Sequence, residues 1–213
     1  MGKHNRIPAI IVSLLVAVLL AAGLSGALLW RSAQRVINEA RQAGEYASQA
    51  KASYDRNDIK QALAQLDQAG GHIIAARDEA QGPLWAAAEW VPYYGSDVAA
   101  VRGMLDAGAD AASNALPKID SAAQGTLIDF SLTDLLSGAS LSNGTLSIPK
   151  IASVKQDMAD AGAVLSRVRT SIHALPQPHT RQIADLVEQG RQAADQVDES
   201  FNQLNAIIAK IPG

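Results

Sequence analysis

The chain has 213 residues, of which 48% are hydrophobic but only 4% are aromatic. Alanine supplies much of the apolar share and has the highest helix propensity, so the composition favours helices. A formal net charge of −3 provides no broad basic field, which argues against nucleic acid as a partner. The absence of cysteine excludes a disulfide framework and a thiolate metal site.

A run of 24 residues from Ile7 to Trp30 contains no ionisable side chain, and Lys3, Arg6 and Arg31 flank it. A helix of this length is about 36 Å long, enough to cross a hydrocarbon core of about 30 Å. We therefore predict a short cytoplasmic tail at residues 1–6, a transmembrane helix at residues 7–30 and a separate body at residues 31–213.

The alternative to an anchor is a cleavable signal peptide, because Ser25-Gly26-Ala27 offers small residues for cleavage. The apolar run is longer than the usual signal core of about 7 to 15 residues, which favours the anchor. Orientation is less clear from charge, because the arginines after the span outnumber Lys3 and Arg6 and the positive-inside rule would place the body in the cytoplasm. We expect the body outside the cell membrane on the basis of a family resemblance described below.

Five windows after the span carry apolar or small residues at alternating spacings of three and four, the pattern of heptad packing between helices. We predict an all-α, elongated antiparallel bundle with helices over residues 31–56, 58–90, 96–122, 149–175 and 178–211 and a long loop over 124–148. The first predicted seam is Ala33, Val36, Ala40, Ala43, Ala47, Ala50 and Tyr54. The last is Ile183, Leu186, Gly190, Ala193, Val197, Ser200, Leu204, Ile207 and Ile211.

Local signals place some helix ends. Asp58 is a predicted N-cap for the second helix, and Ser96 or Asp97 for the third, whose end we expect Pro117 to bend.

The pair Gly70-Gly71 lies inside the second predicted helix and has two interpretations, a kink or a close approach by a neighbouring helix. The seam continues in phase across the pair, which favours a continuous helix.

The helix lengths predict an upright body. The first helix leads away from the bilayer over about 26 residues and the second returns, so the turn at residues 85–95 would lie at the bilayer surface. By the same alternation, the loop over 124–148 lies at the far end, the Pro176 to Pro178 turn lies near the membrane, and the C-terminus is lifted away from it.

Aromatic residues are concentrated in one short segment that contains Trp85, Trp90, Tyr93 and Tyr94, while Trp30 closes the predicted span. These rings have three interpretations: a plug for the end of an alanine-rich bundle, a membrane-interface belt, or a platform for sugars or peptides. We take the five residues as candidates for membrane-interface or turn aromatics.

No residue pattern predicts catalysis, a cofactor or a bound metal. The histidines are His4, His72, His173 and His179, and none has metal-ligand spacing to another ligand. The chain contains no nucleophile elbow, phosphate-binding glycine loop or dinucleotide fingerprint. We therefore expect a protein that is not an enzyme.

A family resemblance rests on the segments Pro83-Leu84-Trp85, Glu89-Trp90-Val91-Pro92-Tyr93-Tyr94-Gly95-Ser96-Asp97, Val101-Arg102, Leu116-Pro117 and the closing Ile211-Pro212-Gly213. Through them the chain resembles the N-terminal half of a bacterial membrane-protein family catalogued as domain of unknown function 4012. The resemblance implies a single-pass cell-envelope protein with its body outside and no established activity. In that family a further domain follows the helical part, so this chain is expected to be either a complete product or the stalk of a longer one.

Two functions are compatible with these observations. The first is a membrane-anchored extracytoplasmic stalk or interaction module, with the lipid bilayer, other envelope proteins or further copies of the chain as partners. The alternative is an extracytoplasmic sensor or ligand-binding domain that resembles chemoreceptor bundles, although no later stretch is apolar enough to form a second span.

Overall fold

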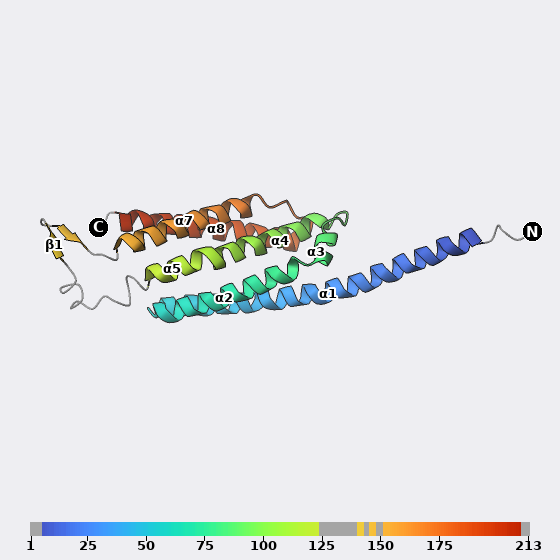
Figure 1. The fold of residues 1–213 in the computed structure, drawn as a ribbon, viewed down its shortest axis with the longest axis horizontal. Helices are drawn as coiled ribbons and strands as arrows, with labels where there is room; N and C mark the ends of the chain where they lie inside the picture. The colour runs from blue at the N-terminus through green and yellow to red at the C-terminus, as the bar shows by residue number, and fades with distance from the viewer. Residues whose placement is uncertain (1–5, 124–139, 143–144, 148–150, 210–213) are drawn as a thin grey trace, which may run out of the picture.

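A computed structural model describes the backbone of residues 6–123, 140–142, 145–147 and 151–209 and the side chains of residues 26–123 and 152–207. It confirms an all-α bundle, elongated and antiparallel (Figure 1). The helices are α1 (Arg6–Asp55), α2 (Ile59–Ala80), α3 (Pro83–Ala88), α4 (Gly95–Asp110), the π-helical segment η1 (Ala111–Ala115), α5 (Leu116–Ala123), α7 (Ile151–His173) and α8 (Arg181–Ala209).

The helices α4, η1 and α5 follow one another without a break and form a central rod. This rod contacts α2 on one side and α7 and α8 on the other, so it joins the α1–α2 hairpin to the α7–α8 hairpin. Its first half packs Leu105 against Val36, Ala76 and Trp85, and its second half packs against α7. The core is therefore a narrow column along the rod.

The N-terminal part of α1 projects far beyond one end of the bundle, which we call the proximal end (Figure 1). The turn between α3 and α4, residues 89–94, and the turn between α7 and α8, residues 174–180, both lie at the proximal end. The α1–α2 turn and the strands lie at the opposite, distal end. Successive turns therefore alternate between the proximal and distal ends, as the helix lengths predict.

The interface between α1 and α2 follows the predicted heptad at one set of positions and departs from it at the other. Buried residues recur every seven residues on both helices, at Val36, Ala43 and Ala50 of α1 and at Ala62, Ala69 and Ala76 of α2. A heptad seam has a second set of positions between the first, which we call the companion positions. On α1 these are Ser32, Glu39, Tyr46 and Ser53, each one residue before the predicted Ala33, Ala40, Ala47 and Tyr54. Of the predicted companions, Ala40, Ala47 and Tyr54 are exposed.

The polar companions on α1 are all partnered by α2 or α3. Glu39 accepts a hydrogen bond from His72 Nδ1 at 2.7 Å, and the His72 ring stacks on Tyr46 with 5.4 Å between ring centroids. Ser53 Oγ donates to Gln65 Oε1 at 2.8 Å. Because these partners satisfy their hydrogen bonds, the polar side chains can lie in the interface between α1 and α2. A prediction based on apolar spacing alone therefore selects the adjacent apolar residues instead.

The second predicted helix, residues 58–90, is divided in the structure into α2 and α3. Gly82 adopts an extended conformation with ψ of 156° and Pro83 opens α3. The residue before proline is disfavoured in the α region, so Gly82-Pro83 ends one helix and starts the next. Within α2 the chain stays helical through Gly70-Gly71, as the continuous seam predicts.

Pro117 lies inside the rod and does not end it. The five residues of η1 come just before α5, and the Leu116 amide donates to Ala111 O, five residues back. A proline ring clashes with the carbonyl of an ordinary α-helical turn, and the wider π turn gives the ring room.

The predicted loop over 124–148 contains a short antiparallel hairpin that the sequence analysis did not predict. Strands β1 (Ser140–Ser142) and β2 (Thr145–Ser147) pair with Leu141 opposite Leu146. The sequence between the strands, Asn143-Gly144, is the strongest two-residue hairpin signal, and it was available from the sequence. Residues 124–139, 143–144 and 148 lie outside the described part of the chain.

Among the residues whose side chains are described, no helix contains a segment long and apolar enough to cross a membrane. Most of the predicted span at residues 7–30 is not among these residues, because the side chains are described only from residue 26 onward. The backbone of the whole span is part of α1. The structure therefore gives the span no support, and the span stays a prediction.

Candidate functional site

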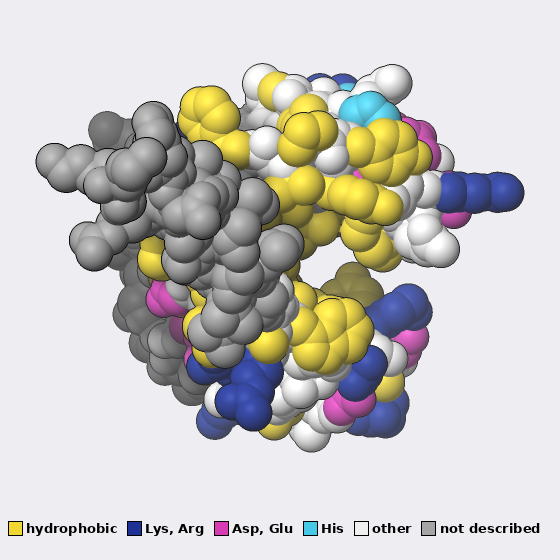
Figure 2. Space-filling model, turned by 90° about the vertical axis from the view of Figure 1, so that its right-hand side faces the viewer, with side chains coloured by type: hydrophobic (Ala, Val, Ile, Leu, Met, Phe, Trp, Pro, Cys, Tyr) yellow, Lys and Arg dark blue, Asp and Glu magenta, His cyan; other side chains and the backbone are white. Residues whose placement is uncertain are grey.

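The proximal end carries large exposed aromatic side chains. Trp30 of α1 is 66% exposed, and Trp90, Tyr93 and Tyr94 of the α3–α4 turn are 88%, 59% and 55% exposed. Figure 2 views this end and shows hydrophobic side chains on both the α1–α2 side and the α7–α8 side, around a hollow between them. Exposed apolar groups gathered on one face are typical of an interaction surface.

Trp85 has a different role from the other four predicted aromatics. It is only 8% exposed and packs with Val36 and Leu105. Its indole Nε1–H donates to Ser32 Oγ at 2.8 Å, and Ser32 in turn donates to Glu79. Trp85 is the one of the five predicted aromatics that belongs to the buried core, and the other four rings are more than half exposed.

The α3–α4 turn is held in a strained, closely packed conformation. Tyr93 has a φ of 74°, in the left-handed region that non-glycine residues seldom adopt. The Gly95 amide donates to Val91 O at 2.9 Å, and a Cβ at Gly95 would lie 2.0 Å from the Glu89 carbonyl oxygen. The position accepts only glycine, so the turn presents Trp90, Tyr93 and Tyr94 on a fixed backbone.

Two side chains of α4 bind the α7–α8 turn. Asp97, which is buried, accepts the His179 amide at 2.6 Å and the Thr180 amide at 3.2 Å. Ser96 Oγ forms a hydrogen bond of 2.6 Å with His179 Nδ1, and the His179 ring lies 4.8 Å from that of Tyr93. These contacts join the two proximal turns into one surface.

The environment of Asp97 favours its charged form. Burial alone would raise the pKa of this carboxyl group, but hydrogen bonds from Thr180 and His179 outweigh burial and lower the pKa below its ordinary value. Asp97 is therefore ionised at neutral pH, and its negative charge lies beside the turn that leads into α8.

The sequence predicts Ser96 or Asp97 as the N-cap of α4, and this prediction is wrong. The helix α4 begins at Gly95, and its N-cap residue Tyr94 makes no side-chain cap hydrogen bond. A cap motif in the sequence shows that a side chain can accept backbone amides, but it does not show which helix supplies them. Asp58, by contrast, caps its own helix α2 by accepting the Gln61 amide at 3.0 Å.

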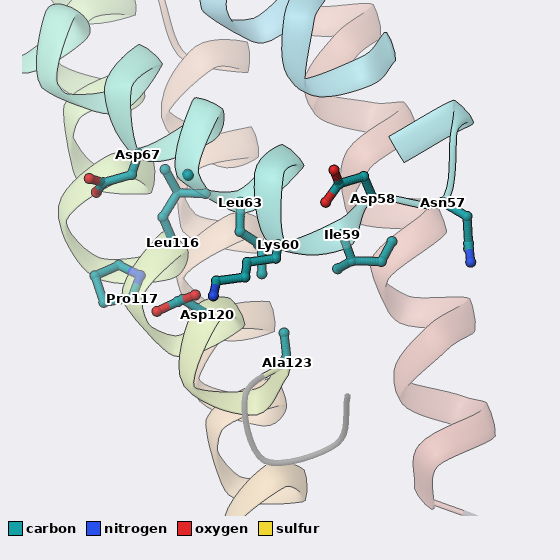
Figure 3. Close-up of a pocket in the computed structure, with 11 residues that line it drawn as sticks. Asn57, Asp58, Ile59, Lys60, Leu63, Asp67, Leu116, Pro117, Asp120 and Ala123 are labelled. Carbon is teal, nitrogen blue, oxygen red and sulfur yellow. The ribbon is translucent and has the colours of Figure 1, made fainter. Parts of the chain in front are cut away.

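A pocket of about 830 Å³ lies at the distal end, between the first turns of α2 and the helix α5 (Figure 3). Ile59, Leu63 and Leu116 form its apolar part, and Lys60 and Asp120 point toward one another across it. The lining reaches Ala123, which is the last described residue before the strands. No sequence pattern singled out this pocket, because its residues come from two separate predicted helices.

In the part of the chain whose side chains are described, no group of three or more histidine or carboxylate residues could hold a metal ion. His72 and His173 each bind a single carboxylate, that of Glu39 and that of Asp195. These histidines take part in contacts between helices.

No protein-family model matches the chain, and neither a curated protein nor a solved structure matches it. The family resemblance described in the sequence therefore stays a prediction.

Proposed function

We propose that this protein is a membrane-anchored helical stalk or interaction module whose proximal end rests on the bilayer surface. The observation that carries the proposal is the exposure of Trp30, Trp90, Tyr93 and Tyr94 at the end of the bundle from which α1 projects. Tryptophan and tyrosine favour the headgroup region, where an apolar ring and a polar atom are both solvated.

The continuity of α1 supports the same proposal. Its backbone is helical from Arg6 to Asp55, so the uncharged residues 7–30 and the first helix of the bundle form one rod. An anchor joined to the body without a linker would fix the height and direction of the bundle. Under this proposal, the body lies outside the cell membrane, as the family resemblance implies, and has no catalytic activity of its own.

The alternative function is a sensor or ligand-binding domain. The observation that favours it is the distal pocket of about 830 Å³, which combines apolar side chains with Lys60 and Asp120. Pockets of this size with a few polar groups are typical of small-molecule sites.

The membrane contact can be tested by tryptophan fluorescence of the full chain in lipid vesicles that contain a headgroup-region quencher. The variant Trp30→Phe keeps Trp85 and Trp90, and the matched control Trp30→Phe/Trp90→Phe keeps only the buried Trp85. We expect clearly stronger quenching in the first variant, because Trp90 is 88% exposed and Trp85 is 8% exposed. Equal quenching in the two variants would show that the α3–α4 turn does not touch the bilayer.

A further inference from the structure

Helix α8 has an apolar face that the described part of the chain leaves uncovered. Leu186, Val197, Leu204 and Ile207 are 50%, 48%, 44% and 62% exposed. Together with Gly190, Ala193 and Ser200 they have the alternating spacings of three and four that the sequence predicts as a seam. We call these seven residues the α8 seam.

Helix α8 packs into its own bundle through a different face. Val187 is 1% exposed, Phe201 packs on the cluster of Ala122 and Met158, and Asn205 Nδ2 donates to Met158 O at 3.4 Å. At 100° per residue this face is centred about 100° around the helix from the α8 seam. The predicted seam of the last helix meets the bundle only along one edge, where a Cβ at Gly190 would lie 3.1 Å from Met104 Cε, and its larger side chains lie outside the internal contact.

The free edge of the α8 seam carries one charged side chain, Asp185 at the start of the seam, and is otherwise lined by uncharged polar residues. Glutamine recurs every seven residues beside it, at Gln182, Gln189, Gln196 and Gln203. The other acidic residues of α8, which include Glu188, Asp195 and Glu199, lie further around the helix. Two copies of this face can therefore meet with no like charges opposed beyond Asp185, whereas a partner chosen by charge would find only Asp185 to pair with along the edge.

We propose that the α8 seam is a homodimer interface in which it packs in parallel against the same seam of a second copy of this chain. The parallel direction rests on the proposed function. In every copy α8 runs from the proximal to the distal end, and copies anchored in one bilayer share that direction. A two-fold axis along the bilayer normal then sets each seam residue opposite its own counterpart.

The direction of pairing is testable because the chain contains no cysteine, so each substitution introduces a single thiol. In a parallel pair Leu186 faces Leu186 and Ile207 faces Ile207, whereas in an antiparallel pair Leu186 faces Ile207. The variants are Leu186→Cys and Ile207→Cys, and the matched control is Asn202→Cys, an exposed position on the opposite side of α8.

The experiment is disulfide cross-linking of the full chain in lipid vesicles under mild oxidation. We expect Leu186→Cys and Ile207→Cys each to form covalent dimers about ten-fold faster than Asn202→Cys, because pairing raises the local thiol concentration. Rates equal to the control would overturn the interface. Cross-linking only in a mixture of Leu186→Cys and Ile207→Cys chains would overturn the parallel arrangement and indicate antiparallel pairing.

A second variant separates loss of pairing from loss of folding. Val197→Asp places a charge in the middle of the α8 seam, at a side chain that is already 48% exposed. We expect the dimer to be lost in sedimentation of the full chain in detergent while helix content by circular dichroism is unchanged. A dimer that persists in this variant would contradict the proposal. The tryptophan quenching test does not depend on α8, so failure of the dimer and failure of membrane contact are read separately.

Discussion

Asp97 is the residue on which the proximal surface depends most directly. Its carboxylate accepts backbone amides from the end of the α7–α8 turn, more than 80 residues away in sequence. Replacing it leaves the His179 and Thr180 amides without their acceptor in a partly buried place. We expect Asp97→Ala to lower the free energy of unfolding by about 2 kcal/mol, measured by urea denaturation at pH 7. An exposed carboxylate such as Asp185, removed as a control, should change it by less than about 0.5 kcal/mol.

The same carboxylate predicts a pH dependence. Its pKa is lowered in the folded state, so its stabilising contribution is complete above the ordinary value of 3.8 and is lost as the pH falls through the folded pKa. We expect the free energy of unfolding of the native chain to fall between about pH 5 and pH 2, and to fall less steeply in Asp97→Ala. Identical slopes in the two proteins would show that the hydrogen bonds to Asp97 do not depend on its charge.

At the scale of the helices, the neighbouring glycines of α2 have opposite environments. A Cβ at Gly70 would lie 3.0 Å from Ala112 Cβ and 3.3 Å from Leu116 Cδ1, whereas at Gly71 nothing lies within 4 Å. We expect Gly70→Leu to destabilise the protein by roughly 1 to 3 kcal/mol, because the side chain would force α2 away from the central rod. Gly71→Leu should raise stability by up to about 1 kcal/mol through helix propensity. Thermal unfolding of the two variants measures the difference, and equal melting temperatures would contradict the close approach.

The heptad seams show which interface residues can be predicted from the sequence and which cannot. Apolar periodicity predicts the number and direction of the long helices, and it selects the buried Val36, Ala43 and Ala50 of α1 correctly. It does not find Ser32 or Glu39, because a polar side chain becomes a good interface residue only once a partner such as Glu79 or His72 is opposite it. That pairing is a property of two helices together and is absent from either segment alone.

The last helix and the candidate site show the same limit. Periodicity detects the α8 seam but cannot tell whether its partner is inside or outside the chain, and the buried face of α8 includes polar residues such as Asn205. The aromatic segment was recognised from composition, but only the fold separates the buried Trp85 from the exposed Trp90. Exposure depends on which helices end beside each other, and the sequence does not contain that information in a local form.

At the scale of the whole molecule, the central rod gives the bundle a direction. The α3–α4 and α7–α8 turns meet at the proximal end through Asp97, and the α1–α2 turn and the strands lie at the distal end. The two ends differ in chemistry, because exposed aromatics occupy the proximal end and the pocket with Lys60 and Asp120 occupies the distal one. Under the proposed function, this polarity would suit the protein to hold its distal end away from the surface on which its proximal end rests.

The upright orientation can be measured by energy transfer from a label on the protein to acceptors in the lipid headgroups. The part of α1 from Arg31 to Asp55 is about 37 Å long, which sets the height of the distal end above the bilayer surface. Gln177→Cys places a label in the exposed α7–α8 turn, and Lys60→Cys places one in the exposed first turn of α2. Because transfer falls steeply with distance, we expect strong transfer from residue 177 and weak transfer from residue 60. Equal transfer from both would mean that the bundle lies flat, and stronger transfer from residue 60 would mean that the distal end faces the membrane.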